Sequence, residues 1–164
     1  MAASTVTKHF TDGSIVLSDG TTPTPVSLTV AADMGDFSVD AITEGQREAV
    51  PYQSRGVLHA VRKGAKVFAS GSLSFMLADV SDASDQTVID FVLAQASYSG
   101  NKGTRANDDV YCIDIKLTIE GTDFNDTADH TFTMNDCHCT MGFAEGSPDT
   151  VSISFTCYGA VDMT

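Results

Sequence analysis

The sequence is poor in positive charge and contains no long apolar run, and each absence excludes a class of protein. Lys and Arg account for 9 of the 164 residues, against 22 Asp and Glu, so the formal net charge is −13. Phosphates repel such a surface, which argues against a sequence-independent grip on nucleic acid but not against DNA passing by without adhering. No apolar stretch approaches the roughly 20 residues that a membrane-spanning helix needs.

Signatures of chemistry are also missing. The chain has no GxGxxG or P-loop pattern, and no catalytic triad can be assigned from spacing. We therefore expect a protein that is not an enzyme and that needs no cofactor. The first residues lack the basic and apolar regions of a signal peptide, so we expect reduced thiols in a reducing cytosol. The four cysteines are Cys112, Cys137, Cys139 and Cys157.

Two motifs resemble metal sites, but neither fits one well. On a strand, Cys137 and Cys139 would share one face and His138 would lie on the other, which is poor geometry for a single zinc ion. Buried structural thiols are the expected alternative. Residues 123–129 resemble the start of a calcium loop but lack its glycine at position six and its glutamate at position twelve. We expect a solvated acidic turn there, and no metal site in the chain.

Alternation of apolar and polar residues, bounded by turn signals, indicates seven to nine β-strands. The segment Val110–Glu120 alternates most regularly, as in an antiparallel sheet with one face in the core. In His130–Phe143 the apolar positions change parity at Asn135-Asp136, which predicts a β-bulge. Other strands are expected at Ser14–Leu17, Pro25–Val30, Gly35–Thr43, Val57–Val61, Val67–Leu77 and Thr150–Val161.

One helix is expected, at about Asp85–Ser97, because its apolar residues recur every three or four positions. Acidic and hydroxyl side chains within residues 82–85 would cap its start, and Gly100 would end it. No β–α–β alternation is present. The sequence thus predicts one all-β domain over residues 1–164, an antiparallel sandwich or partial barrel with a flanking helix and a long arm-like loop at about 44–66.

The predicted arm is polar, rich in turn residues and basic. Within it, Val57–Val61 is partly apolar on both faces and needs cover on both, from its own domain or from a neighbour; Lys63–Lys66 predicts a hairpin-like break. No Lys or Arg follows Lys116. A basic arm and an acidic C-terminal third can attract each other between copies, although an ordinary acidic surface explains the charge equally well. The predicted interface residues are Arg47, Arg55, Val57, Leu58, Val61, Arg62, Lys63 and Lys66.

The middle of the chain resembles the tail tube (major tail) proteins of long-tailed bacteriophages. The resemblance rests on Gly35–Ser38, Glu44–Glu48, Arg55–Val57 and the strand Ser70–Phe75 leading to a helix, together with the order of the elements. It implies a β-sandwich with one outer helix, whose copies close into hexameric rings. These rings would stack into the hollow tube of a virion tail, with the arm reaching neighbouring subunits and the adjacent ring.

The resemblance also implies partners: other copies of the chain, a tape-measure protein, a tail terminator and an initiator complex. Assembly would take place in the bacterial cytoplasm, without a membrane, and DNA would later pass through the lumen unbound. An acidic lumen would repel phosphate. Asp114 and Glu120, on a polar strand face, are lumen candidates, but they can equally face outer solvent. The additional immunoglobulin-like domain of some members is not expected.

Two alternatives remain open. One is a carbohydrate-binding or adhesin-type β-sandwich, calcium-dependent through residues 123–129. The other is the tube protein of type VI secretion systems, which has the same ring architecture as the tail tube.

Overall fold

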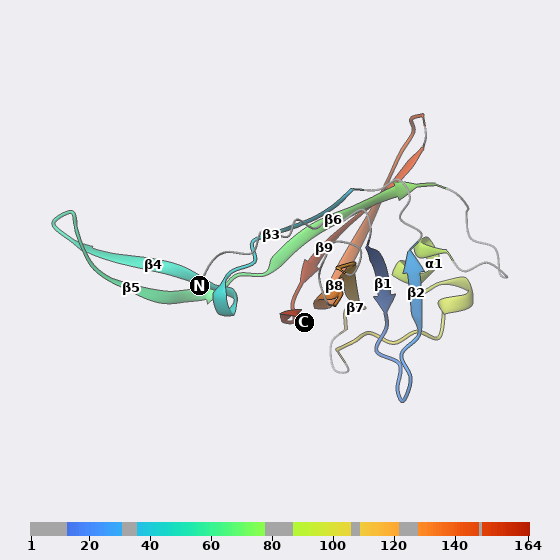
Figure 1. Cartoon of the computed structure of the whole chain (residues 1–164), viewed down its shortest axis with the longest axis horizontal. Coiled ribbons are helices and arrows are strands. Elements are labelled where there is room, and N and C mark those ends of the chain that lie inside the picture. The colour runs from blue at the N-terminus through green and yellow to red at the C-terminus, as the bar shows by residue number, and fades with distance from the viewer. Residues whose placement is uncertain (1–12, 31–35, 78–86, 106–108, 122–127, 148) are drawn as a thin grey trace.

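The computed structural model describes residues 13–30, 36–77, 87–105, 109–121, 128–147 and 149–164. It shows a β-rich body from which one long hairpin projects (Figure 1). The described part contains one α-helix, α1 (Val88–Leu93), and two 3-10 helices, η2 (Glu44–Gln46) and η3 (Ala96–Tyr98). The strands are β1 (Ser14–Ser18), β2 (Ser27–Val30), β3 (Phe37–Asp40), β4 (Arg47–Ser54), β5 (Val57–Lys66), β6 (Ala69–Met76), β7 (Ile113–Ile119), β8 (His130–Ala144), β9 (Thr150–Cys157) and β10 (Val161–Met163).

The body is an eight-stranded antiparallel sheet in the order β2-β1-β7-β8-β9-β6-β3, with β10 also paired to β8. The all-β prediction with one helix is therefore confirmed. The path ends at β2 and at β3, so the described strands form an open sheet and not a closed barrel. β4 and β5 pair separately as a two-stranded ribbon.

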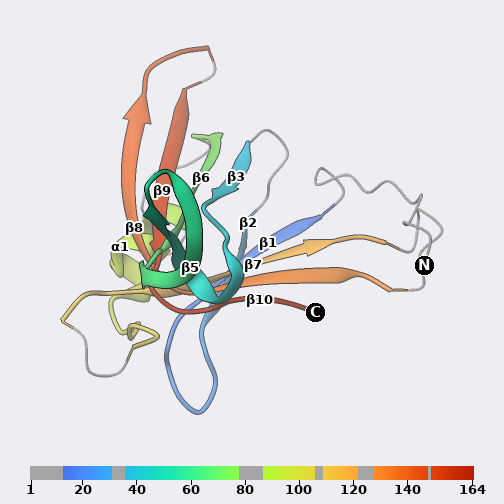
Figure 2. The same cartoon turned by 90° about the vertical axis from the view of Figure 1, so that its left-hand side faces the viewer.

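β8 bends the sheet around the core. Its first part pairs with β7 and β10, and its second part pairs with β9. Where β8 changes from one set of partners to the other, Asp136 has φ +56, in the left-handed region, and the register with β7 shifts. The bulge predicted at Asn135-Asp136 is therefore confirmed, and Figure 2 shows the resulting turn in β8. The bend lets both halves of the sheet bury side chains in one cluster.

The strand predicted over Thr150–Val161 is interrupted, and this corrects the sequence interpretation. Opposite the bulge, the N–H groups of Tyr158 and Gly159 donate to the carbonyls of Asp136 and Asn135, both at 3.0 Å. Residues 158–160 at this point separate β9 from β10. Alternation of apolar residues continues across the interruption, so the sequence alone does not reveal it.

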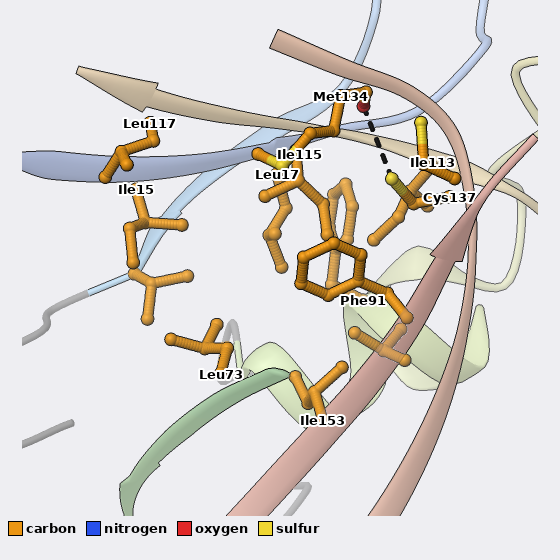
Figure 3. Close-up of a cluster of buried hydrophobic side chains, with 14 of the residues drawn as sticks. Ile15, Leu17, Leu73, Phe91, Ile113, Ile115, Leu117, Met134, Cys137 and Ile153 are labelled. Atoms are coloured by element: carbon orange, nitrogen blue, oxygen red, sulfur yellow. Dashed lines mark hydrogen bonds between the residues drawn. The ribbon is translucent and has the colours of Figure 1, made fainter. Parts of the chain in front are cut away.

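The core lies between the two halves of the bent sheet. Every second residue of β7 is buried, as the alternation predicted. Figure 3 shows Phe91 of α1 pointing into this cluster, where it is 0% exposed. Its ring meets that of Tyr98 edge-on, with centroids 4.9 Å apart. The buried apolar residues of the two strands that flank β8 are Ile113, Ile115, Leu117 and Ile119 of β7 and Val151, Ile153, Phe155 and Cys157 of β9.

The helix is shorter than predicted. The Thr87 hydroxyl accepts a hydrogen bond from the Asp90 N–H at 3.1 Å and so caps its start. The helix ends at Leu93, and the next residue, Ala94, has φ +50. The Ala94 N–H bonds to Phe91 O and the Gln95 N–H to Asp90 O, which is a Schellman arrangement. The predicted end at Gly100 is therefore wrong, and residues 82–85, the predicted capping segment, lie outside the described residues. No helix in the described part is long and apolar enough to cross a membrane.

A buried carboxylate fixes the loop between β1 and β2. Asp19 is 2% exposed and accepts backbone N–H bonds from Thr21 at 3.1 Å, Val26 at 2.6 Å and Lys102 at 3.2 Å. Burial alone raises the pKa of Asp19, but these hydrogen bonds and one from the Thr21 hydroxyl lower it below its usual value. A Cβ on the adjacent Gly20 would lie 2.2 Å from the Gly103 carbonyl, so this close approach requires glycine.

Candidate assembly surface

The segment predicted as an arm forms a two-stranded antiparallel ribbon. After η2, strand β4 pairs with β5 along most of its length. In Figure 1 the ribbon extends away from the body. The predicted break at Lys63–Lys66 is wrong, because β5 continues through Lys66. The chain reverses instead at Arg55-Gly56, between the paired residues Ser54 and Val57.

The reversal and the twist of the ribbon have local causes. Arg55 and Gly56 have φ values of +48 and +79. A two-residue turn with both φ values positive matches the right-handed twist of the flanking strands. Further along, Gln53 pairs with Leu58 and Tyr52 with Ala60, which leaves His59 as an extra residue. Such a bulge increases the local twist and disrupts the ladder.

The ribbon exposes large apolar side chains. Val57 is 70% exposed, Leu58 and Val61 are both 57% exposed, and Tyr52 is 51% exposed. A two-stranded hairpin without further cover is only marginally stable in water. Fully covering a Val or Leu side chain contributes about 1.5–3 kcal/mol. The apolar residues near the turn therefore favour contact with another protein surface.

The cations of the ribbon divide into two groups. At the base, the Arg47 guanidinium donates to the Gly64 carbonyl at 3.3 Å, and the Lys66 ammonium donates to the Tyr158 carbonyl at 2.7 Å. Nearer the turn, the Arg62 guanidinium lies 5.5 Å from the centroid of the Tyr52 ring. Arg47 and Lys66, although predicted as interface residues, thus already fasten the ribbon to itself and to the body.

The two remaining predicted cations lie on the ribbon as well. Arg55 is in the turn, and Lys63 is on β5 opposite Ala49. Both are exposed. With Arg62, they make the outer part of the ribbon basic.

Besides the ribbon, the described part of the body has an unpaired strand edge and two recesses that another chain could contact. β3 pairs only with β6 among the described strands, and an unpaired edge can add a strand from another chain. Beside it lies a mostly apolar recess of about 310 Å³. A second cleft of about 800 Å³ lies at the base of the ribbon, next to Lys66, Phe68 and Tyr158. The first recess is lined by Phe37, Ser38, Val39, Ile42, Leu117, Phe132, Met134 and Val161.

The two predicted lumen residues have different environments. Asp114, on β7, is half-buried, and its Oδ1 accepts the Asp136 N–H at 2.9 Å. Burial raises the pKa of Asp114, the hydrogen bond lowers it, and the Asp136 charge raises it, with a net upward shift. Asp114 thus supports the bulge whichever surface it faces. Glu120 directly follows β7 and is partly exposed.

The described residues contain no group of three or more His, Cys, Asp or Glu side chains placed to hold a metal ion. Cys137 is buried, Cys139 is partly buried, and all four cysteines are free thiols. The His138 ring nitrogen Nδ1 lies 3.4 Å from the Tyr111 carbonyl. Most of the predicted calcium-like loop lies outside the described residues; Asp129, at its end, accepts the Gly121 N–H at 3.1 Å.

Known proteins resemble this chain in fold but not in sequence. No protein-family model and no curated protein matches the sequence. The fold matches a chain of the sheath-tube complex of an extracellular contractile injection system (PVC) in its extended state, with 11% identity and a TM-score of 0.51, over 92% of this chain and 87% of that one. The chain therefore shares its fold with a chain of that complex.

Two further matches agree. A chain of the sheath/tube terminator of the same system, also extended, has 11% identity and a TM-score of 0.51, covering 92% of each chain. A chain of the baseplate of the anti-feeding prophage has 12% identity and a TM-score of 0.50, covering 100% of this chain and 97% of that one. These likenesses are consistent with the fold that the tail-tube resemblance implied.

Proposed function

We propose that the chain is the structural subunit of a tail tube, and that its copies close into hexameric rings which stack into a hollow tube. The observation that carries the proposal is the β4–β5 ribbon, which leaves the body and exposes Val57, Leu58 and Val61 to solvent. A body with its own core does not need such an element for its own packing. A neighbouring copy supplies the missing cover.

Two contacts of different kind build a tube. Lateral pairing through open strand edges, such as that of β3, closes a ring and removes exposed edges. Stacking of rings through the ribbon is head-to-tail and does not close, so it continues into a filament. The likeness to chains of sheath-tube, terminator and baseplate assemblies supports this role for the fold.

We also propose a location and partners for the tube. The chain acts as a structural protein without catalysis, in a virion tail assembled in the bacterial cytoplasm. It packs around a tape-measure protein and meets the terminator and initiator complexes at the two tube ends. DNA passes through the lumen without specific binding, since a subunit with a formal charge of −13 repels phosphate.

Electron microscopy of the purified protein, combined with light scattering, tests assembly directly. Wild-type protein is expected to form rings or tubes, alone or with the tape-measure protein. The variant Val57→Asp, Leu58→Asp, Val61→Asp is expected to stay monomeric with an unchanged circular dichroism spectrum. The matched control is Leu93→Asp, because Leu93 is 48% exposed on α1, away from the ribbon. A wild-type chain that remains monomeric in every condition overturns the proposal.

A further inference from the structure

Two buried cysteines face each other across adjacent strands. Cys137 of β8 is the register partner of Cys157 of β9, and both side chains are 0% exposed. Figure 3 shows Cys137 inside the core cluster, with its thiol donating to the Met134 carbonyl at 3.4 Å. The Cys157 thiol donates to the Asn135 carbonyl at 3.0 Å. Both side chains therefore lie on the same inner face of the sheet, at the bend of β8.

The backbone pairing defines the geometry of this pair. Cys137 and Cys157 are opposite each other in the antiparallel ladder of β8 and β9. The Cα atoms of opposite residues in such a ladder are about 4.5 Å apart in a non-hydrogen-bonded pair and about 5.5 Å apart in a hydrogen-bonded one. Both separations lie within the range of about 4.4–6.8 Å that a disulfide spans.

We propose that Cys137 and Cys157 are a disulfide-forming pair, reduced in the assembling subunit and oxidised by a small-molecule disulfide when the protein meets an oxidising environment. The inference does not depend on the proposed tube function, because it concerns two strands of one chain. It goes beyond the expectation of reduced, buried structural thiols, since two of the four are placed to react with each other.

The oxidation balances as thiol–disulfide exchange. One cysteine, as the thiolate, attacks the reagent disulfide and forms a mixed disulfide, releasing one small thiolate, which takes up a proton. The second cysteine then loses its proton and attacks the protein sulfur of that mixed disulfide, releasing the second small thiol. Two protein thiols have thus lost two hydrogens, and one reagent disulfide has become two thiols.

The environment of the pair indicates the order of attack. A hydrogen bond to Cys157, together with burial, raises the pKa of Cys137, and the same hydrogen bond lowers the pKa of Cys157. The direction for Cys157 agrees with its position, described next, as the attacking sulfur, with Cys137 as the resolving one. Cys157 also adjoins the interruption before the short terminal strand β10 (Val161–Met163), whose local opening would admit the reagent.

The other two cysteines offer the competing pairing. Burial, and secondarily the Cys112 charge, raises the pKa of Cys139 to about 12. Cys112 lies just before β7 and is not a register partner of Cys139 in the described pairing. An experiment must therefore separate the Cys137–Cys157 pairing from a link between Cys112 and Cys139.

Intact-mass spectrometry of the folded protein, incubated with oxidised glutathione and then alkylated, tests the proposal. We expect the loss of two hydrogens and protection of two of the four thiols. The double variant Cys112→Ala, Cys139→Ala is expected to form the same bond. The single variant Cys137→Ala is expected to stop at a glutathione adduct on Cys157.

Further outcomes are decisive in either direction. If circular dichroism shows that Cys137→Ala does not fold, two other measurements show whether the bond joins Cys137 and Cys157. These are oxidation of the double variant and fragment-ion mapping of the oxidised wild type. Oxidation is expected to raise the melting temperature by roughly 5–10 °C, reversibly with dithiothreitol. Four alkylated thiols after prolonged incubation just below the melting temperature overturn the proposal. So does a bond that the double variant cannot form, or one that does not raise the melting temperature.

Discussion

The body and the ribbon are built from the same kind of strand but are stabilised differently. In the body, alternate residues of β7 and β9 are buried and every strand has neighbours in one bent sheet. In the ribbon, nearly all side chains of β4 and β5 are exposed, and among the described strands these two pair with each other alone. The body is thus stabilised by its own core, whereas the ribbon needs contact with another surface to be stable.

This difference separates folding from assembly. Substitutions in the body should change the stability of the monomer, and those in the outer ribbon should change association and leave the monomer unaffected. Only the base of the ribbon, where Lys66 bonds to Tyr158 O and Val67 N–H to Gln46 O, belongs to both regions. If the two regions are independent, substitutions in one should leave the property of the other unchanged.

The largest effect is expected in the core. Phe91→Ala removes a ring that is 0% exposed, so the free energy of unfolding should fall by about 3–5 kcal/mol. Val57→Ala, at a side chain that is 70% exposed, should change it by less than about 0.5 kcal/mol. Chemical denaturation of monomeric protein measures both. If Val57→Ala destabilises the monomer as much as Phe91→Ala, the ribbon packs on its own body and the separation fails.

A smaller effect is expected at the loop of the body that Asp19 holds together. Asp19→Asn weakens three backbone hydrogen bonds to a carboxylate and should cost about 1.5–3 kcal/mol. The control is Asp40→Asn, because Asp40 is exposed on β3; it should be neutral within about 0.5 kcal/mol.

The same carboxylate gives a pH dependence with a defined sign. Because the pKa of Asp19 is lowered in the folded state, its stabilisation is complete above the unfolded pKa of about 3.9. That stabilisation is lost as the pH falls through the folded value. Thermal melts from pH 5 to pH 2 should show this loss in the wild type and a weaker one in Asp19→Asn. Parallel curves would mean that Asp19 does not hold this loop through its charge.

The sequence predicts some elements of the structure and not others, and the difference has a physical cause. The β7 strand and the bulge in β8 were predicted because alternation and its change of parity are local consequences of one buried face. The C-terminal end of α1 and the position of the ribbon turn were not, because each depends on a positive φ. Ala94 and Arg55 adopt such values, and neither residue type signals them.

The candidate surface was predicted as a segment but not as a geometry. Charge and two-faced apolar character identified residues 44–66, while the role of Arg47 and Lys66 at the base emerges only once Gly64 O and Tyr158 O are in place. The recess beside β3 brings together Phe37, Leu117 and Val161, which are distant in sequence. No local sequence pattern predicts these tertiary contacts, because they depend on the curvature of the open sheet.

The smallest effect per contact is expected from the charges of the outer ribbon. Arg55→Glu with Arg62→Glu should leave the melting temperature of the monomer unchanged but slow tube growth at low salt, because surface ion pairs contribute only about 0–1 kcal/mol each but recur at every subunit. The matched control reverses the exposed Lys102 and Lys116 to Glu, which changes the net charge equally outside the ribbon. Growth rates from light scattering at low and high salt measure the difference. If both variants grow like the wild type, the ribbon associates through Val57, Leu58 and Val61 or through its strand edges, and its positive charge has no part in the contact.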